Sequence, residues 1–173
     1  PNVSKTERSQ PKIAPSSSYH KKTNTQAHRH DKHIVKASHF GINPRMFSRN
    51  AITVVEKLQR QGYDAYIVGG CLRDLLLGKH PKDFDVATNA RPDQIQAVFQ
   101  RQCRLVGRRF RLAHIMFGRD VIEVATFRAS HSDARSENQA KQSDEGMLLR
   151  DNVYGTIEQD AERRDFTVNA LYY

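Results

Sequence analysis

The sequence has 173 residues, enough for one domain with a hydrophobic core, and a formal net charge of +9. This excess of positive charge favours a polyanionic partner. Its two cysteines, Cys71 and Cys103, are too few for a disulfide framework and fit a reducing cytoplasm. No apolar run approaches the ~20 residues that a transmembrane helix needs, so we expect no membrane association.

The N-terminal residues 1–39 form a basic segment. They carry eight lysines and arginines against two acids, so about +6 of the net charge lies here. The segment is rich in Ser, Thr, Asn and Gln and has no periodic apolar face, so we predict a disordered arm. An arm that contacts nucleic acid and a solubilising tail remain equally open interpretations.

The first predicted helix begins after a cap at Ser48 and ends at about Arg60. Its apolar residues recur at intervals of three and four, which places them on one stripe: Ala51, Val54, Val55 and Leu58. Gly62 then stops the helix. This element belongs to the core and shows no sign of chemistry.

A short strand, a glycine pair and a second helix follow. Residues 66–68 are apolar and β-branched, which predicts a strand. Gly69 and Gly70 let the backbone approach a bulky anion, and a helix predicted over residues 71–77 points the positive end of its dipole there. The order of these elements predicts a phosphate cradle, although a glycine pair alone is common in turns.

An acid pair on the next predicted strand, residues 83–87, is the second signal. Asp83 and Asp85 leave the same face, with Cα atoms roughly 6.6 Å apart. Two charges about 4 Å apart cost on the order of 4 kcal/mol at an effective dielectric of 20. A Mg²⁺ ion removes that cost and prefers one or two carboxylates with substrate phosphates. The pair beside the cradle therefore indicates nucleotidyl transfer, and a solvated surface pair is the alternative.

Pro92 suits the first position of another helix, with Ile95, Val98 and Phe99 on its inner face. A short strand is predicted over residues 104–106. Beyond it lies a basic run of three arginines, Arg108, Arg109 and Arg111, which alternate with apolar residues. In a strand, the second and third would share a face and could meet phosphate. A merely solvated basic face is the alternative.

Residues 114–117 and 121–127 predict a hairpin that turns at Gly118. Glu123 lies inside its second arm, either as a third acid beside the aspartate pair or as the partner of a nearby arginine. Residues 129–150 are polar, without apolar periodicity, and predict a long mobile loop. Residues 157–172 then predict a packed helical segment.

Three blocks together resemble one known family. Residues 69–78 (GGCLRDLLLG) followed by 82–85 (KDFD), and later residues 163–170 (RRDFTVNA), resemble the head domain of class II nucleotidyltransferases. That family includes the bacterial poly(A) polymerases and tRNA CCA-adding enzymes. Residues 105–114 (LVGRRFRLAH) are typical of the poly(A) polymerases. The resemblance covers about residues 48–173, and Cys71 departs mildly from the small residue usual there.

The resemblance implies an α+β fold with a DNA polymerase β-like palm, a mixed β-sheet with helices packed on one side. It implies a head domain over residues 40–173, with neck, body and tail regions outside this chain. The base is read in the neck region of the family. Two Mg²⁺ ions and ATP are the implied cofactor and substrate.

The residue pattern predicts that Asp83 and Asp85 bind metal and catalyse, that Gly69, Gly70 and Arg73 bind the nucleotide, and that Arg108, Arg109 and Arg111 bind the RNA. The resemblance adds Asp165 to the catalytic acids and Arg164 to the nucleotide-binding residues. Since Arg163, Arg164 and Asp165 are consecutive, we expect one arginine to face the site and the other to face solvent or RNA. The alternative is that Asp165 holds Arg164 while Glu123 completes the metal site.

The expected activity is template-independent addition of AMP from ATP to RNA 3′ ends, that is, polyadenylation in RNA processing and turnover. A tRNA CCA-adding transferase is the alternative enzyme, and an inert RNA-binding module is the alternative of another class. A monomer in the cytoplasm that works with the RNA-degradation machinery is the expected setting.

Overall fold

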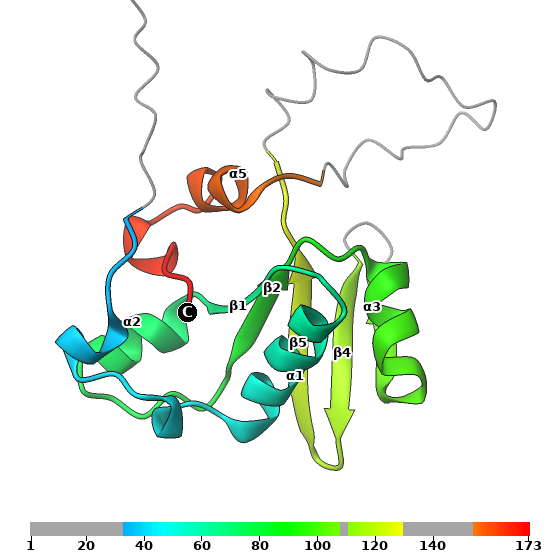
Figure 1. Ribbon diagram of the computed structural model, residues 1–173, viewed down its shortest axis with the longest axis horizontal. Coiled ribbons are helices and arrows are strands. Elements are labelled where there is room, and N and C mark those ends of the chain that lie inside the picture. Colours follow the sequence, from blue (N-terminus) through cyan, green and yellow to red (C-terminus); the bar gives the residue numbers. More distant parts are fainter. Residues whose placement is uncertain (1–32, 108–110, 130–153) are drawn as a thin grey trace, which may run out of the picture. The chain divides into compact units, whose positions relative to one another are not determined.

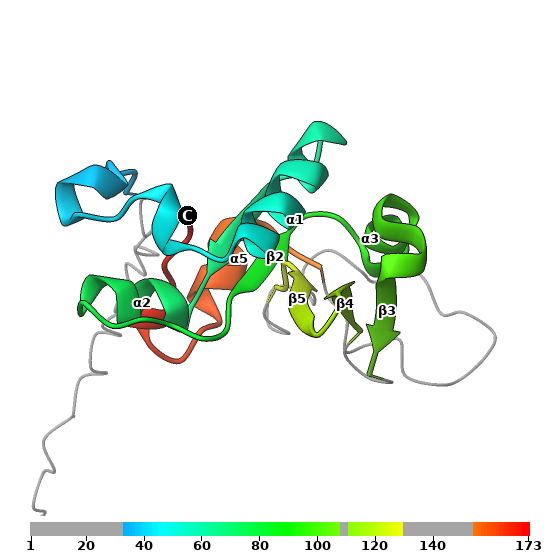
Figure 2. The same cartoon turned by 90° about the horizontal axis from the view of Figure 1, so that it is seen from below.

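Five strands form one mixed sheet in the spatial order β1-β2-β5-β4-β3 (Figures 1 and 2). The computed structural model describes residues 33–107, 111–129 and 154–173. The strands are β1 Ala65–Val68, β2 Asp85–Thr88, β3 Cys103–Val106, β4 Leu112–Phe117 and β5 Asp120–Thr126. β2 and β5 run parallel, and every other neighbouring pair is antiparallel. The predicted α+β fold with a mixed sheet is confirmed.

Helices connect and flank these strands. In the described residues the α-helices are α1 Arg49–Arg60, α2 Gly70–Leu76, α3 Pro92–Phe99 and α5 Ile157–Glu162. The short 3-10 helices are η1 Ala37–Phe40, η2 Pro44–Met46, η3 Gln100–Gln102 and η5 Thr167–Asn169. The helices and strands predicted between Ser48 and Phe127 all form, with ends within about two residues of those expected.

The first helix illustrates how local sequence sets an element. The Ala51 amide donates to the Ser48 hydroxyl at 3.4 Å, which satisfies one of the free N–H groups at the start of α1. The four residues of its predicted stripe are all buried. They pack with the inner sides of the strands and with α3, so the stripe of α1 belongs to the main core.

The two faces of the sheet have different coverings. α1 and α3 lie on one face, where Val86 and Val124 point into the main core (Figure 2). On the other face, Ile157 of α5 and Tyr172 pack against β1 and β2 near Val68. Over β3, β4 and β5 that second face keeps side chains exposed, including Val106, Met116 and Val121 at 38–40%.

The C-terminal segment corrects one prediction. The helical segment predicted over residues 157–172 is wrong beyond Glu162, where α5 ends with Arg163 as its cap. Thr167, Val168 and Asn169 are poor helix formers and make only a 3-10 turn. The last residues run beside β1 instead, since Ile67 and Tyr173 exchange backbone hydrogen bonds of 2.8 Å in both directions.

Several predictions lie outside the described residues. These are most of the basic arm, Arg108 and Arg109, and nearly all of the loop at residues 129–150. The domain boundaries therefore stay predictions. Where the structure describes the chain, it contains no helix long and apolar enough to cross a membrane.

Candidate active site

The glycine pair forms a sharp turn between β1 and α2. Gly69 has φ 83° and ψ −142°, a backbone conformation that is essentially restricted to glycine. A Cβ atom at Gly69 would lie 3.6 Å from Nη1 of Arg164, and one at Gly70 would lie 3.3 Å from Nη2 of Arg73. The structure thus brings together all four residues predicted to bind the nucleotide.

The turn is tied to the end of the chain by its own backbone. The Gly69 amide donates to the Leu171 carbonyl at 3.2 Å, so it is not free to bind an anion. In the first turn of α2, the Leu72 amide is also bound, because it donates to the Gly69 carbonyl at 3.1 Å. Gly69 therefore contributes its conformation and its missing side chain rather than its N–H group.

Arg73 is braced from two sides. Its guanidinium donates to Oδ1 of Asp74 at 2.8 and 2.9 Å and to Oδ1 of Asn169 at 3.0 Å. Asn169 lies in η5, ninety-six residues further along the chain, and the contact fixes the arginine beside the turn. The side chain of Arg73 is 38% exposed, so part of the group still faces solvent.

The acidic residues line an open cleft of about 440 Å³. Asp83 lies two residues before β2 and Asp85 is its first residue, with Phe84 buried between them. Asp83, Phe84 and Asp85 all line the cleft. The remaining lining residues include Glu123 and His114.

Strand register explains why these residues meet. Val86 pairs with Val124 across β2 and β5, which places Asp85 next to Glu123 on the second face of the sheet. Glu123 pairs with His114, and His114 pairs with Arg104. One row thus crosses four strands on one face, acidic at β2 and β5 and basic at β4 and β3.

The electrostatics agree with this row. Burial raises the pKa of Asp85, and the neighbouring charges of Glu123 and Asp83 raise it further, while Arg164 opposes them. His114 Nε2 lies 3.4 Å from a carboxylate oxygen of Glu123. Like charges therefore converge on Asp85, and the cation of Arg164 is close enough to act on it.

The donor atoms of the cleft suit a hard divalent cation. In the described part of the chain, no group of three or more His, Cys, Asp or Glu side chains is arranged to hold a metal ion by itself. Mg²⁺ does not need such a cage, because it commonly takes one or two carboxylates with phosphate oxygens and water. Asp83 and Asp85, two carboxylates on one cleft, fit an ion whose other ligands arrive with a nucleotide.

The arginine pair near the C-terminus shares one carboxylate. Arg164 lies against the Gly69 turn and Arg163 is exposed, which agrees with the expectation that one arginine faces the site and the other faces solvent. Both also bind the carboxylate of Asp160, Arg163 at 2.9 Å and Arg164 at 3.0 Å. The alternative in which Asp165 holds Arg164 is wrong, because Asp165 accepts the amide of Phe166 and Asp160 holds Arg164.

Sequence reasoning missed Asp160, Tyr172, His114 and Arg104. Asp160 had a usable signal, since it precedes Arg163 by three residues and Arg164 by four, the spacings of ion pairs on a helix. The contact of Tyr172 with Asp160 depends on how the C-terminal segment folds back, which no local pattern indicates. His114 and Arg104 need the strand register, which sequence alone did not give.

Comparison with known proteins shows the family to which the chain belongs. A family model, the poly A polymerase head domain, matches residues 65–173. The chain belongs to this family. Poly(A) polymerase I of Haemophilus influenzae is 82% identical over 152 residues, which are 88% of this chain and 34% of that protein. Poly(A) polymerase I of Salmonella typhimurium is 57% identical over 141 residues, 81% of this chain and 30% of that protein.

More distant relatives are CCA-adding enzymes. The CCA-adding enzyme of Staphylococcus haemolyticus is 35% identical over 118 residues, 68% of this chain and 27% of that protein. The crystal structure of the Bacillus stearothermophilus CCA-adding enzyme in complex with CTP matches with a TM-score of 0.56 and 30% identity, over 76% of this chain and 28% of that chain. The head domain thus has the nucleotidyltransferase fold. It spans about a third of the length of the poly(A) polymerases that it matches.

Proposed function

We propose that this head domain catalyses template-independent addition of AMP from ATP to RNA 3′ ends. The observation that supports it most is that the acidic cleft lies near the Gly69 turn, in a chain 82% identical to a poly(A) polymerase I. Asp85 connects the two parts. Its carboxylate lines the cleft, and the charge of Arg164, which lies against the turn, lowers its pKa.

Asp83 and Asp85 hold the metal in this proposal, and Glu123 is a neighbouring carboxylate of the same cleft rather than a third metal ligand. Glu123 lines the cleft with both aspartates, whereas Asp165 is not among the lining residues and accepts the Phe166 amide. Two bound Mg²⁺ ions would lower the pKa of the RNA 3′-hydroxyl and offset the charge on the leaving pyrophosphate.

The reaction needs no protein nucleophile. The RNA 3′-oxygen attacks the α-phosphorus, its proton passes to solvent, and the bond from that phosphorus to the bridging oxygen of the β-phosphate breaks. Arg73 and Arg164 bind the triphosphate beside the turn and orient it for this attack. Both guanidinium groups are already braced by hydrogen bonds, so little rearrangement is required when the nucleotide binds.

The RNA strand enters over the open face of β3, β4 and β5. The row along this face changes from acidic to basic at His114 and Arg104, the order that a metal site followed by phosphates requires. The exposed Val121 and Met116 beside it offer apolar contact to a ribose or base. Arg111, the only one of the three predicted RNA-binding arginines in the described residues, is exposed just before β4.

Incubation with labelled RNA and each nucleoside triphosphate tests the proposal. We expect long A tracts from ATP alone, and we expect Asp83→Ala and Asp85→Ala to lower incorporation at least about a thousandfold, since a metal supplies several kcal/mol. Addition that stops after C-C-A on tRNA would indicate the CCA-adding alternative. RNA binding without Mg²⁺-dependent turnover would indicate an inert module. The Haemophilus influenzae enzyme serves as the positive control.

The setting of the reaction is part of the same proposal. Cys71 is buried, its sulfhydryl donates to the Val68 carbonyl, and burial with the nearby Asp85 charge raises its pKa to about 11. Such a thiol stays protonated, which is compatible with a reducing cytoplasm. A monomer that cooperates with the RNA-degradation machinery completes the proposed setting.

A further inference from the structure

Asp160 is a buried carboxylate that the proposed chemistry does not use. Only 1% of the residue is exposed, although it is charged. Its Oδ1 accepts from the Arg163 guanidinium and from the Arg128 amide, and its Oδ2 accepts from Arg164 and from the Tyr172 hydroxyl at 2.7 Å. A buried charge is tolerated only when it is well paired, so these donors stabilise the ionised carboxylate of Asp160.

Arg164 is held in a way that leaves part of it free. A guanidinium has five N–H donors. Arg164 uses Nε on the Tyr172 hydroxyl at 3.2 Å, Nη1 on the Asn169 carbonyl at 3.1 Å and Nη2 on Asp160 at 3.0 Å. Two N–H donors remain without a partner among the described residues, and Nη1 is the atom that lies against Gly69.

The charge of the cluster remains positive. One carboxylate faces two guanidinium groups, those of Arg163 and Arg164, at 3.0 Å or less. A single aspartate with a single arginine would be neutral and would have little attraction for an anion. With Arg163 as the second partner, Asp160 can fix Arg164 in position without cancelling its charge.

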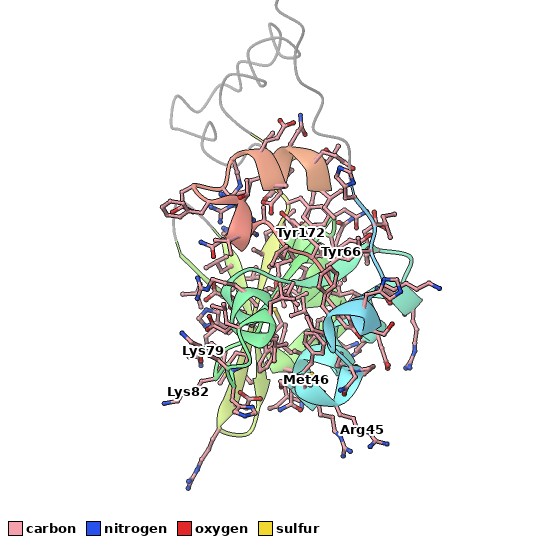
Figure 3. All side chains as sticks on the ribbon, turned by 90° about the vertical axis from the view of Figure 1, so that its left-hand side faces the viewer. Arg45, Met46, Tyr66, Lys79, Lys82 and Tyr172 are labelled. Carbon is pink, nitrogen blue, oxygen red and sulfur yellow. The ribbon has the colours of Figure 1, made fainter. Side chains whose placement is uncertain are left out.

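Tyr172 joins this cluster to the turn. It forms a β-bridge with Val68, the residue before Gly69, so its backbone position is fixed relative to the turn. Its ring packs with Tyr66 at 6.2 Å and with Phe127 at 6.5 Å between ring centroids, and Figure 3 shows Tyr66 and Tyr172 close together. Its pKa is raised by burial and by Asp160, so the hydroxyl keeps the proton that it donates.

We propose that Asp160 and Tyr172 are positioning residues that hold Arg164 against the Gly69 turn, so that its two free N–H groups meet the phosphates of a nucleoside triphosphate. The inference rests on the proposed function for the identity of the ligand. It predicts that damage to the cluster weakens binding of the phosphate chain and spares recognition of the rest of the nucleotide.

Tyr172→Phe is the sharpest probe, because it removes one hydroxyl and keeps the ring. We expect its Kd for MgATP to rise about threefold to tenfold, the effect of one lost hydrogen bond, while its Kd for AMP changes less than twofold. The KM for ATP should rise with the Kd while kcat changes little. Tyr66→Phe is the matched control, since it removes a hydroxyl from the same aromatic cluster. In the described residues that hydroxyl makes no hydrogen bond, and we expect both Kd values to stay unchanged.

Asp160→Asn is the second variant and should weaken MgATP binding more than tenfold. Circular dichroism at the assay temperature checks that both variants are folded. Equal losses of AMP and ATP affinity in Tyr172→Phe, or no loss in either, would overturn the inference, because a purely structural role moves both ligands alike. If wild-type protein binds MgATP through this cluster but transfers no AMP to RNA, the proposed function is refuted and the inference about Asp160 and Tyr172 still holds. Wild-type protein that does not bind MgATP would overturn both.

Discussion

Replacing Asp83 with Asn should make the metal-free protein more stable. Asp83 and Asp85 line one cleft, and the charges of Asp83 and Glu123 both raise the pKa of Asp85. These acids therefore repel each other in the folded chain, and the repulsion is relieved when the chain unfolds. Asn keeps the shape of the side chain and removes its charge.

The size of the effect follows from the geometry. The Cα atoms of residues two apart in extended chain are roughly 6.6 Å apart, and Asp83 is exposed to water. Charges about 6 Å apart in such an environment repel by on the order of 1 kcal/mol. For a chain of this length, that corresponds to a rise in Tm of about 2–4 °C.

Magnesium should reverse the order of stability. A Mg²⁺ concentration ten times the Kd stabilises the wild-type chain by about 1.4 kcal/mol, while Asp83→Asn has one ligand fewer and gains less. Thermal denaturation with Mg²⁺ titrated at constant ionic strength measures both effects. Glu56→Gln is the control, since it neutralises an exposed acid that pairs only with Arg60 among the described residues, and its Tm should respond to Mg²⁺ as that of the wild type does. An Asp83→Asn variant less stable than wild type without Mg²⁺, or a wild-type Tm insensitive to Mg²⁺, would refute the reasoning.

Three further predictions concern the turn, the RNA face and the buried carboxylate. Gly69→Ala should lower the free energy of unfolding, measured by urea denaturation, by about 2–3 kcal/mol and should weaken ATP binding. Gly41→Ala is the control: its backbone has φ 71° and ψ 6°, so it should lose only about 1 kcal/mol and bind ATP as the wild type does. Arg104→Ala should weaken RNA binding and reduce the slope of log K against log salt by about 0.7 at unchanged ATP affinity; an unchanged slope would exclude a phosphate contact. Burial would raise the pKa of Asp160, but Tyr172, Arg163, the Arg128 amide and Arg164 together lower it below its usual 3.8. Its stabilising effect is thus complete above about pH 4 and lost as pH falls through the lowered pKa, so the stability gap between wild type and Asp160→Asn should narrow only below pH 4.

The parts of the fold that were predictable are those specified by local pattern. The stripe of α1, the glycine turn and the hairpin of β4 and β5 each depend on residues close together in sequence. The acid pair was predictable for the same reason, because Asp83 and Asp85 are separated by one buried residue, Phe84. Periodicity and spacing were sufficient there.

The parts that were not predictable depend on contacts between distant segments. The C-terminal helix was extended too far because nothing local indicates that Leu171 and Tyr173 pair with the chain around β1. The same fold-back brings Tyr172 to Asp160 and thus sets the position of Arg164. The row from Asp85 to Arg104 likewise requires a parallel pairing of β2 with β5, strands more than thirty residues apart in the chain.

Electron paramagnetic resonance of Mn²⁺, used in place of Mg²⁺ with ATP present, tests most directly whether the acid pair and the glycine turn serve one nucleotide. The proposed site predicts that wild-type protein takes up Mn²⁺ together with ATP, and that Asp85→Asn and Gly69→Ala each weaken this joint uptake. If either variant bound Mn²⁺ and ATP as the wild type does, the cleft and the turn would not form a single site.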